Sequence, residues 1–265
     1  DNRRGGGDTS MAENRIKSRL AAGDTTYGIF LGLAHPLASE VSAPAGFDWL
    51  LIDGEHAPND VTSIKAQMDV LVAHSEDVFV RIRDRDPGHL KQLLDIGVRN
   101  FLVPVVDTVE QAEALVAAVR YPPGGVRGVG ALGARATNFG RNPKYLTEAN
   151  EGICLLVQIE TRLGISNMDA ILAVDGVDGI FFGPADLSAD FGYIGQPGHP
   201  EVKAAVIEGC AKARAAGKAA GVMTLDDSLI EAYRDAGANF LSVGLDTNLL
   251  AKAADALAAK WVKSS

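Results

Sequence analysis

Charged and polar side chains stand at the ends of four of the apolar runs in this chain. They include carboxylates, one imidazole, one guanidinium and one amide, which are groups that bind ions and move protons. If the four positions meet in the fold, they form a catalytic or binding site. The segments are Asp53-Gly54-Glu55-His56, Arg81, Gln158-Ile159-Glu160 and Gly183-Pro184-Ala185-Asp186-Leu187-Ser188.

Glu160 and Asp186 are the candidates for holding a metal ion. Two carboxylates, completed by water and substrate oxygens, suit hard divalent cations such as Mg²⁺ or Mn²⁺. The pattern also fits two salt-bridged strand ends, and it does not identify the metal.

His56 and Arg81 are the candidates for the chemistry itself. An imidazole titrates near neutral pH, so His56 could act as a general base. Arg81 could bind a carboxylate or stabilise developing negative charge, and its alternative is a structural ion pair with Asp53 or Glu55. The four segments carry no lysine, which favours a metal ion over a lysine Schiff base.

Eight short apolar runs alternate with helical patterns along the chain. The runs are continuously apolar, as in parallel strands that are buried on both faces. Eight such repeats in a chain of 265 residues predict a single (β/α)₈ barrel, with a doubly wound sheet as the alternative. In both folds, functional groups follow the carboxyl ends of the strands. The predicted strands are Tyr27–Leu33, Trp49–Asp53, Val78–Ile82, Phe101–Val106, Cys154–Ile159, Gly179–Phe182, Ala219–Leu225 and Phe240–Val243.

Helix signals fall between these runs. Apolar periodicity, capping residues and terminal glycines mark the helices. An extra helix over Ala12–Ala22 precedes the first strand, and a last one over about Asp246–Trp261 closes the chain. The helices predicted between them are Asp60–His74, His89–Ile96, Thr108–Val119, Pro200–Ala216 and Ser228–Ala236.

Composition excludes several classes of protein. A hydrophobic fraction of 47% is too high for a mainly disordered chain, and a net charge of −9 disfavours a nucleic-acid partner. No apolar run approaches the roughly 20 residues of a membrane span. Two cysteines rule out a disulfide framework and, together with the missing export signal, suggest the cytoplasm. We expect residues 1–10 to be a disordered tail or an appended remnant and residues 11–265 to form one domain.

Two short motifs invite other interpretations. Gly128–Gly133 fits the G-x-G-x-x-G pattern, but Tyr121-Pro122-Pro123-Gly124-Gly125 before it breaks the strand that a dinucleotide site needs. We therefore expect a glycine-rich loop over the barrel mouth that carries Arg127 and Arg135. Asp190-Phe191-Gly192 matches a kinase tripeptide, without the rest of a kinase signature.

Four segments of the chain form a pattern when they are taken together, namely Phe47–His56, Arg120–Gly128, Gln158–Thr161 and Gly183–Ser188. They resemble the HpcH/HpaI aldolases, which are class II pyruvate aldolases. The resemblance runs in order from about Lys17 to Trp261, and it implies a barrel of the phosphoenolpyruvate/pyruvate type. Phe139-Gly140-Arg141-Asn142 departs from the family's pattern, where a tryptophan often follows Ala-Arg-Ala, so the acceptor stays open.

The resemblance also implies roles for single residues and a form of assembly. Family members are usually homo-hexamers, trimers of dimers, in which the final helix is exchanged between subunits. The implied roles are Glu160 and Asp186 as metal ligands, Gln158 and the backbone of Ala185 as oxoacid contacts, His56 as base, Arg81 as transition-state stabiliser, and Asp95 as a carboxylate that supports the base of a neighbouring subunit.

The implied activity is reversible cleavage of a 4-hydroxy-2-oxoacid, through a metal-bound enolate, to pyruvate or hydroxypyruvate and an aldehyde. The partners would be these small molecules, and Co²⁺ or Zn²⁺ are further candidates for the metal. Two alternatives stay open. One is a CoA-ester lyase of the citramalyl- or malyl-CoA type, and the other is a barrel that binds an oxoacid without turnover.

Overall fold

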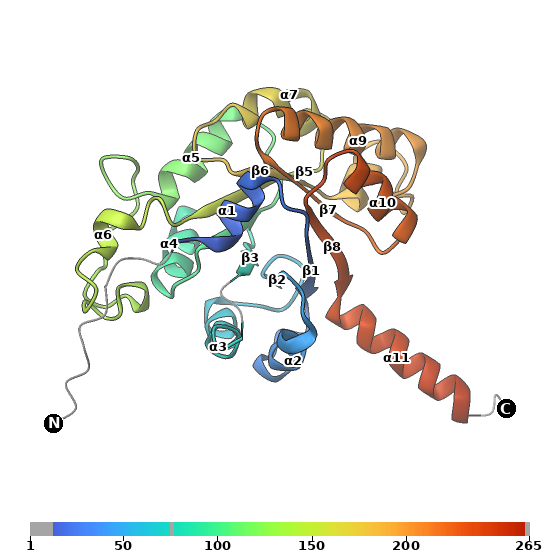
Figure 1. Ribbon diagram of the computed structural model, residues 1–265, viewed down its shortest axis with the longest axis horizontal. Helices are drawn as coiled ribbons and strands as arrows, with labels where there is room; N and C mark the ends of the chain where they lie inside the picture. The colour runs from blue at the N-terminus through green and yellow to red at the C-terminus, as the bar shows by residue number, and fades with distance from the viewer. Residues whose placement is uncertain (1–12, 75–76, 263–265) are drawn as a thin grey trace.

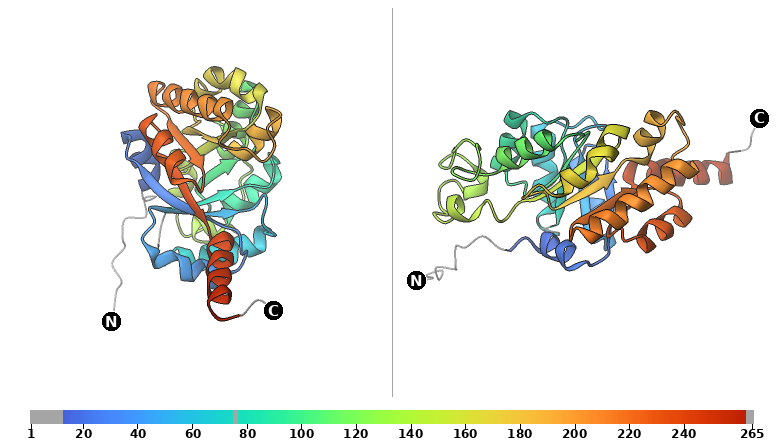
Figure 2. Two further views of the ribbon diagram at one scale, coloured as in Figure 1. Left: turned by 90° about the vertical axis from the view of Figure 1, so that its right-hand side faces the viewer. Right: turned by 90° about the horizontal axis from the view of Figure 1, so that it is seen from above.

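The computed structural model describes residues 13–74 and 77–262. Eight parallel strands form a closed barrel in sequence order, with helices around it (Figures 1 and 2). This confirms the predicted barrel over the doubly wound sheet. The strands are β1 (Thr26–Leu31), β2 (Trp49–Asp53), β3 (Val78–Arg81), β4 (Asn100–Val103), β5 (Cys154–Ile159), β6 (Gly179–Phe182), β7 (Ala219–Met223) and β8 (Phe240–Leu245).

Three strands have the predicted bounds, β2, β5 and β6, and the other five differ at one or both ends. β1 and β8 pair to close the barrel, with a register shift between Gly28 and Ile29. Because side chains alternate along a strand, every second residue of each strand faces the barrel interior.

Aromatic side chains fill the barrel interior. Trp49 stacks on Phe240 with ring centroids 3.9 Å apart, and Phe79 lies 4.7 Å from the same ring. Ile16 and Leu20 of α1 (Arg15–Ala22) belong to this buried cluster, so the extra N-terminal helix packs against the barrel interior. It begins at Arg15, three residues later than predicted, and ends at Gly23, whose φ is 93°.

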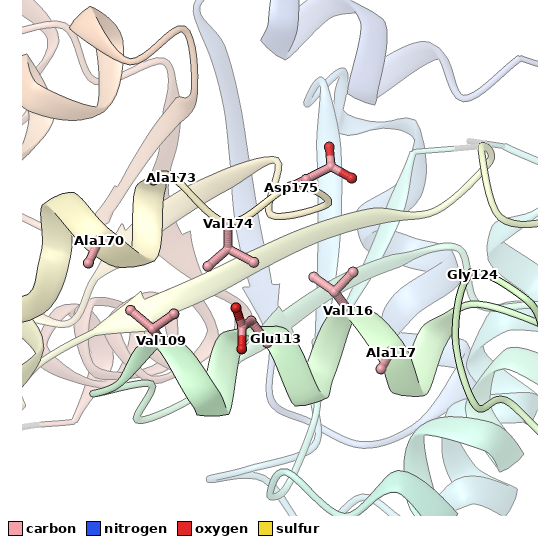
Figure 3. A pocket seen from close by; sticks show the side chains of 9 residues that line it. All are labelled: Val109, Glu113, Val116, Ala117, Gly124, Ala170, Ala173, Val174 and Asp175. Carbon is pink, nitrogen blue, oxygen red and sulfur yellow. The ribbon is translucent and has the colours of Figure 1, made fainter.

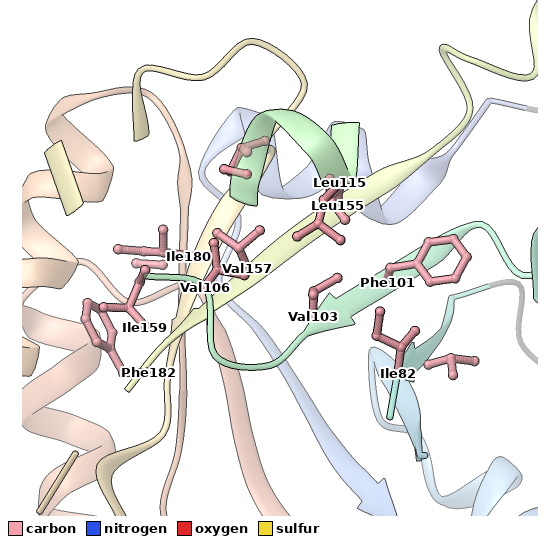
Figure 4. Close-up of a cluster of buried hydrophobic side chains, with 14 of the residues drawn as sticks. Ile82, Phe101, Val103, Val106, Leu115, Leu155, Val157, Ile159, Ile180 and Phe182 are labelled. Atoms are coloured by element: carbon pink, nitrogen blue, oxygen red, sulfur yellow. The ribbon is translucent and has the colours of Figure 1, made fainter. Parts of the chain in front are cut away.

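A second apolar layer lies between the strands and the surrounding helices. It is built from the outward positions of the strands, such as Val103, Val157 and Ile180, and from helix residues such as Leu115 (Figure 4). This double burial explains why the strands read as continuously apolar in the sequence.

The predicted capping residues begin the helices that follow β2 and β4. Asp60 and Thr108 each accept a hydrogen bond from the backbone of the third helical residue, in capping boxes. Four helices that the sequence analysis did not predict are α2, α6, α7 and α8. The helices of the ring are α2 (Pro36–Ser42), α3 (Val61–Leu71), α4 (Pro87–Asp95), α5 (Val109–Val119), α6 (Tyr145–Glu148), α7 (Arg162–Leu172), α8 (Pro184–Asp190), α9 (Pro200–Ala215) and α10 (Asp227–Asp235).

The last helix, α11 (Asp246–Trp261), has the predicted bounds and points away from the barrel (Figure 1). Asp246 anchors its first turn, because the buried carboxylate accepts the backbone N–H groups of Gly32 at 2.7 Å and Leu33 at 3.2 Å. Within 13–74 and 77–262, no helix is both long and apolar enough to cross a bilayer. The tail predicted for residues 1–10 lies outside the described residues.

Candidate active site

The predicted site residues stand at inward positions where the strands end. Asp53 is the last residue of β2, Arg81 is the last of β3, and the two are register partners. On β5, Gln158 faces inward and Glu160 follows the strand in the same alternation. Strand period and barrel closure therefore bring four polar side chains, 107 positions apart in the chain at the extremes (160 − 53), to one end of the barrel.

The guanidinium of Arg81 is bound by the carboxylates of Asp53 and Glu55. Its Nε donates to Asp53 Oδ1 at 2.9 Å and its Nη2 to Asp53 Oδ2 at 2.7 Å, in a bidentate pair. Its Nη1 lies 3.0 Å from Glu55 Oε2. Its guanidinium carbon also lies 5.0 Å from the centroid of the Phe30 ring. Arg81 therefore forms the ion pairs with Asp53 and Glu55 that were the structural alternative for this residue. The same contacts fix the guanidinium at the barrel end.

The turn after β2 wraps around Asp53. The backbone N–H groups of Glu55 and His56 donate to Asp53 Oδ1 at 3.0 and 3.4 Å. Glycine is required at position 54, because a Cβ there would lie 2.6 Å from the carbonyl oxygen of Arg81. The Asp-Gly-Glu-His segment is therefore a tight turn that presents Glu55 and His56 beside the arginine.

Electrostatics differ between the carboxylates of the site. Burial alone would raise the pKa of Asp53, but the hydrogen bonds and charge of Arg81 outweigh burial and hold that pKa below 3.8. Burial raises the pKa of Glu55, and the nearby charges of Asp53 and Asp186 raise it further against the opposing charge of Arg81. For Glu160, burial comes first and the charges of Asp186 and Glu55 follow, and together they raise its pKa to about 7.

Glu160 is held in place by its neighbours on both sides. Its Oε1 accepts the backbone N–H of Val105 at 2.9 Å, and its Oε2 accepts a short hydrogen bond from Gln158 Nε2. Val105 has a φ of 52°, a left-handed conformation that is costly for a β-branched residue. A Cβ at position 183 would lie 2.5 Å from Glu160 Oε2, so a larger residue there would force this carboxylate to shift.

Asp186 approaches the same place from α8. Gly183 is the N-cap residue, without a capping side chain, and Pro184 opens the helix. Ala185 and Asp186 follow in the first turn, where backbone N–H groups lack helical partners and favour anions. The negative charge of Asp186 contributes to the raised pKa of both Glu160 and Glu55.

The residues present fit a divalent cation. Over the described part of the chain, no three His, Cys, Asp or Glu side chains are grouped to hold a metal ion. Glu160 and Asp186 still offer hard oxygen ligands, and their mutual repulsion is relieved by a cation between them. The Oε1 atom of Gln158 is buried beside them without a hydrogen-bond partner, as expected of a group that awaits a ligand.

His56 lies at the edge of this cluster. Its side chain is 67% exposed, and its Nε2 is 3.8 Å from Glu55 Oε2. It is thus the solvent-facing member of the site, accessible to a substrate that enters from the barrel end.

The structure does not bring Asp95 to the other predicted site residues within one chain. Asp95 ends α4, whose course leads away from the carboxyl end of β3, and its Oδ1 accepts from Arg127 Nη2 at 2.9 Å. Its predicted role involves a neighbouring subunit, and one chain does not test that role.

The glycine-rich loop was expected over the barrel mouth, and this expectation is wrong for the single chain. The segment connects α5 to β5, and a helix-to-strand connection emerges at the amino ends of the strands. Arg127 is buried between Tyr121 and Tyr145, 4.2 and 5.7 Å from their ring centroids. Arg135 contacts the carbonyl of Ile96 and, at 3.3 Å, the Asp69 carboxylate.

Sequence reasoning missed the role of Val105 and the reason for Gly183. A left-handed valine has no signature in the sequence, because valine is normally excluded from that conformation. Gly183 stands directly between the β6 run and a Pro-initiated helix, which is a signal for close backbone approach that could have been used.

A groove of about 450 Å³ lies elsewhere, on the outer face of the barrel between α5 and α7 (Figure 3). It has an apolar floor with Glu113 and Asp175 at its rim, and it contains none of the residues of the candidate site.

Known proteins match this chain over most of its length. A family model described as HpcH/HpaI aldolase/citrate lyase matches residues 26–253. A hydroxypyruvate/pyruvate aldolase of Roseovarius nubinhibens is 51% identical over 248 residues, which cover 94% of this chain and 96% of that protein. A 4-hydroxy-2-oxo-heptane-1,7-dioate aldolase of Salmonella dublin is 49% identical, with 94% and 95% covered. A solved HpcH/HpaI aldolase/citrate lyase family protein of Burkholderia cenocepacia superposes with a TM-score of 0.89 at 35% identity, covering 93% of this chain and 98% of that one.

Proposed function

This chain belongs to the HpcH/HpaI aldolase/citrate lyase family, and on that premise we propose that it reversibly cleaves a 4-hydroxy-2-oxoacid to pyruvate or hydroxypyruvate and an aldehyde. The observation that carries the proposal is the meeting of Glu160, Asp186 and Arg81 at one barrel end, with His56 at its open edge. Relatives at about 50% identity carry aldolase names, which supports cleavage of a free hydroxy-oxoacid over cleavage of a CoA ester.

We assign Glu160 and Asp186 to a divalent cation, Mg²⁺ or Mn²⁺ in the first place, with Co²⁺ or Zn²⁺ as alternatives. When bound, such an ion supplies Lewis acidity toward the keto oxygen of a 2-oxoacid. The short hydrogen bond from Gln158 and the Val105 N–H keep the Glu160 carboxylate oriented for this purpose.

The protein's own groups would bind and orient the oxoacid. The N–H of Ala185, in the first turn of α8, suits its carboxylate, and the unpartnered Gln158 Oε1 marks a further polar contact. Arg81 holds its positive charge next to the place where the keto oxygen gains negative charge. Because Asp53 and Glu55 fix it, that charge needs no reorganisation during the reaction.

In the cleavage direction, His56 accepts the proton of the C4 hydroxyl group. The C3–C4 bond then breaks, C4 leaves as the aldehyde carbonyl, and the electron pair of the bond remains on C3 as the enolate of the oxoacid. Protonation at C3 completes the oxoacid product. Condensation is the reverse sequence, with His56 returning the proton to the new alkoxide.

We further propose a homo-hexamer in which α11 is exchanged between subunits and Asp95 supports the His56 of a neighbour. Support comes from α11, which exposes apolar side chains in the single chain, with Leu257 62% and Trp261 73% exposed. We also propose a cytoplasmic location, which the two buried free cysteines support.

The test is carbon–carbon cleavage by metal-free and reconstituted protein. We expect chelation to abolish release of pyruvate from a 4-hydroxy-2-oxoacid, Mn²⁺ or Mg²⁺ to restore it without CoA, and borohydride with substrate not to trap the protein. Activity that survives exhaustive chelation would refute the metal assignment. A panel of aldehydes with pyruvate and hydroxypyruvate then identifies the acceptor and the preferred donor.

A further inference from the structure

Asp190-Phe191-Gly192 has no part in the proposed reaction, but it lies close in the chain to one of the proposed metal ligands. Asp190 is the last residue of α8, the helix that carries Asp186, and Phe191 is its C-cap. Arg162 is the first residue of α7, two positions after Glu160, which follows the neighbouring strand β5. The two carboxylates assigned to the metal are therefore each followed within a few residues by one partner of the contact described next.

Arg162 binds the end of α8 through several atoms. Its backbone N–H donates to Asp190 Oδ2 at 2.7 Å. Its Nε donates to the carbonyl oxygen of Asp190 at 3.3 Å, and its Nη2 donates to that of Phe191 at 3.0 Å. Its guanidinium carbon lies 4.2 Å from the centroid of the Phe191 ring. We call this contact the Arg162 clamp.

The clamp satisfies carbonyl groups that a helix leaves without partners at its carboxyl end, and it places a cation where the helix dipole favours one. It also ties the segment of Glu160 to the far end of α8. The near end of α8 is already fixed, because Gly183 packs against Glu160 Oε2 and Gln158 Nε2 without room for a Cβ.

Both ends of α8 are thus attached to the β5 segment, although Glu160 and Asp186 repel each other. The middle of α8 is held as well, because Leu187 and Ser188 are fully buried. The clamp adds the restraint on the last turn, and with it on the rotation of the helix about its own axis, which sets the direction of Asp186. Resting on the proposed metal site, we propose that Arg162 is a positioning residue that fixes the separation of Glu160 and Asp186 and so sets the affinity for the divalent cation.

The clamp lies at the surface, since Arg162 and Asp190 are both exposed. Exposed polar contacts contribute little to folding stability, typically about 1 kcal/mol or less. Loss of Arg162 should therefore change cation binding without unfolding the barrel, which separates a positioning role from a structural one.

The experiment is calorimetric titration of metal-free protein with Mn²⁺. We expect Arg162→Ala to weaken Mn²⁺ binding by about fivefold, which corresponds to about 1 kcal/mol, the upper value for an exposed contact. Arg162→Lys should fall between, because one ammonium group cannot reproduce the fork of a guanidinium. The matched control is Arg234→Ala, another exposed arginine, paired with Asp235 on α10. It should bind Mn²⁺ like the wild type.

A second variant protects the test against misfolding. Asp190→Ala removes the acceptor of the Arg162 N–H and leaves both carbonyl contacts, so we expect a smaller loss of affinity. Thermal melting of each metal-free variant checks the fold. Unchanged Mn²⁺ affinity in both Arg162→Ala and Asp190→Ala overturns the clamp proposal alone. Failure of the wild type to bind Mn²⁺ overturns the proposed function and this inference with it.

Discussion

Arg81 brings one positive charge to a cluster of four carboxylates at this end of the barrel. The negative charges of the carboxylates exceed the single positive charge of Arg81, so the cluster as a whole is negative. An anionic substrate would be repelled by such a site unless a further cation were present. The proposed divalent ion supplies this further positive charge beside the carboxylates. A protein with a net charge of −9 needs such a local cation to hold an anionic substrate. The four carboxylates are Asp53, Glu55, Glu160 and Asp186.

His56 is the residue whose loss should affect turnover most cleanly. It is 67% exposed and makes no contact that the fold depends on. We expect His56→Ala to lower kcat for cleavage by roughly 10²–10⁴-fold, the usual value of a general base, while pyruvate affinity stays the same. Steady-state kinetics and direct pyruvate binding test this. An unchanged kcat would show that His56 is not the base, whereas pyruvate binding without any cleavage by the wild type would favour the alternative of a barrel that binds an oxoacid without turnover.

The Asp53–Arg81 pair gives the fold a defined acid response. The pKa of Asp53 is lowered below 3.8 in the folded state, so the native protein binds fewer protons than the unfolded chain. Asp53 therefore contributes stability above about pH 4, and this contribution is lost as the pH falls through the lowered pKa. We expect Asp53→Asn to be destabilised at pH 7 by about 3–5 kcal/mol, because a buried ion pair has lost one partner.

Denaturant melts at several pH values measure this effect. The wild type should lose stability below pH 4 more steeply than Asp53→Asn, so the two curves converge in acid. Parallel curves over that range would show that the carboxylate of Asp53 does not carry the stabilisation.

At the scale of elements, the site depends on how closely α8 approaches β5. Gly183→Ala places a Cβ within 2.5 Å of Glu160 Oε2, so the carboxylate or the helix must move. We expect this variant to weaken Mn²⁺ binding by about tenfold or more, while the barrel stays folded. The control is Gly133→Ala, where a Cβ meets nothing within 4 Å. Equal Mn²⁺ affinity of the two variants would contradict the close-approach argument.

The elements also show where sequence reasoning succeeds and fails. The runs that end at Asp53 and Ile159 had the right bounds, because strands buried on both faces are apolar throughout and stop where polar residues begin. The same ends predicted Glu160 and Arg81 as neighbours. The contacts that sequence reasoning did not predict join residues far apart in the chain. Val105 reaches Glu160 only through a strained backbone conformation. Arg127 lies under a loop whose path no local sequence pattern specifies.

At the scale of the whole molecule, α11 is anchored through Asp246, and its residues from Leu249 onward are exposed in the described part of the chain. Its exposed apolar side chains include Leu250, Leu257 and Trp261, spaced to share one helix face. Burying each would contribute about 1.5–3 kcal/mol, so a second copy gains by covering them. We expect a chain that stops after residue 248, and so keeps the Asp246 anchor, to form a smaller assembly by light scattering. Lys252→Ala, on the other face, should assemble normally. A full-length protein that is monomeric would contradict the proposal.

The assembly and the chemistry meet at Asp95, which the single chain keeps away from its own His56. If each site combines one subunit's His56 with a neighbour's Asp95, two inactive variants should rescue each other. His56→Ala and Asp95→Ala, each impaired alone, are unfolded together in equal amounts and refolded. A site is complete when its own chain supplies His56 and its neighbour supplies Asp95, so about a quarter of sites in a symmetric assembly should recover. Mixing without refolding is the control. If Asp95 instead acts within its own chain, no mixed assembly contains a complete site and the activity stays at the level of the separate variants.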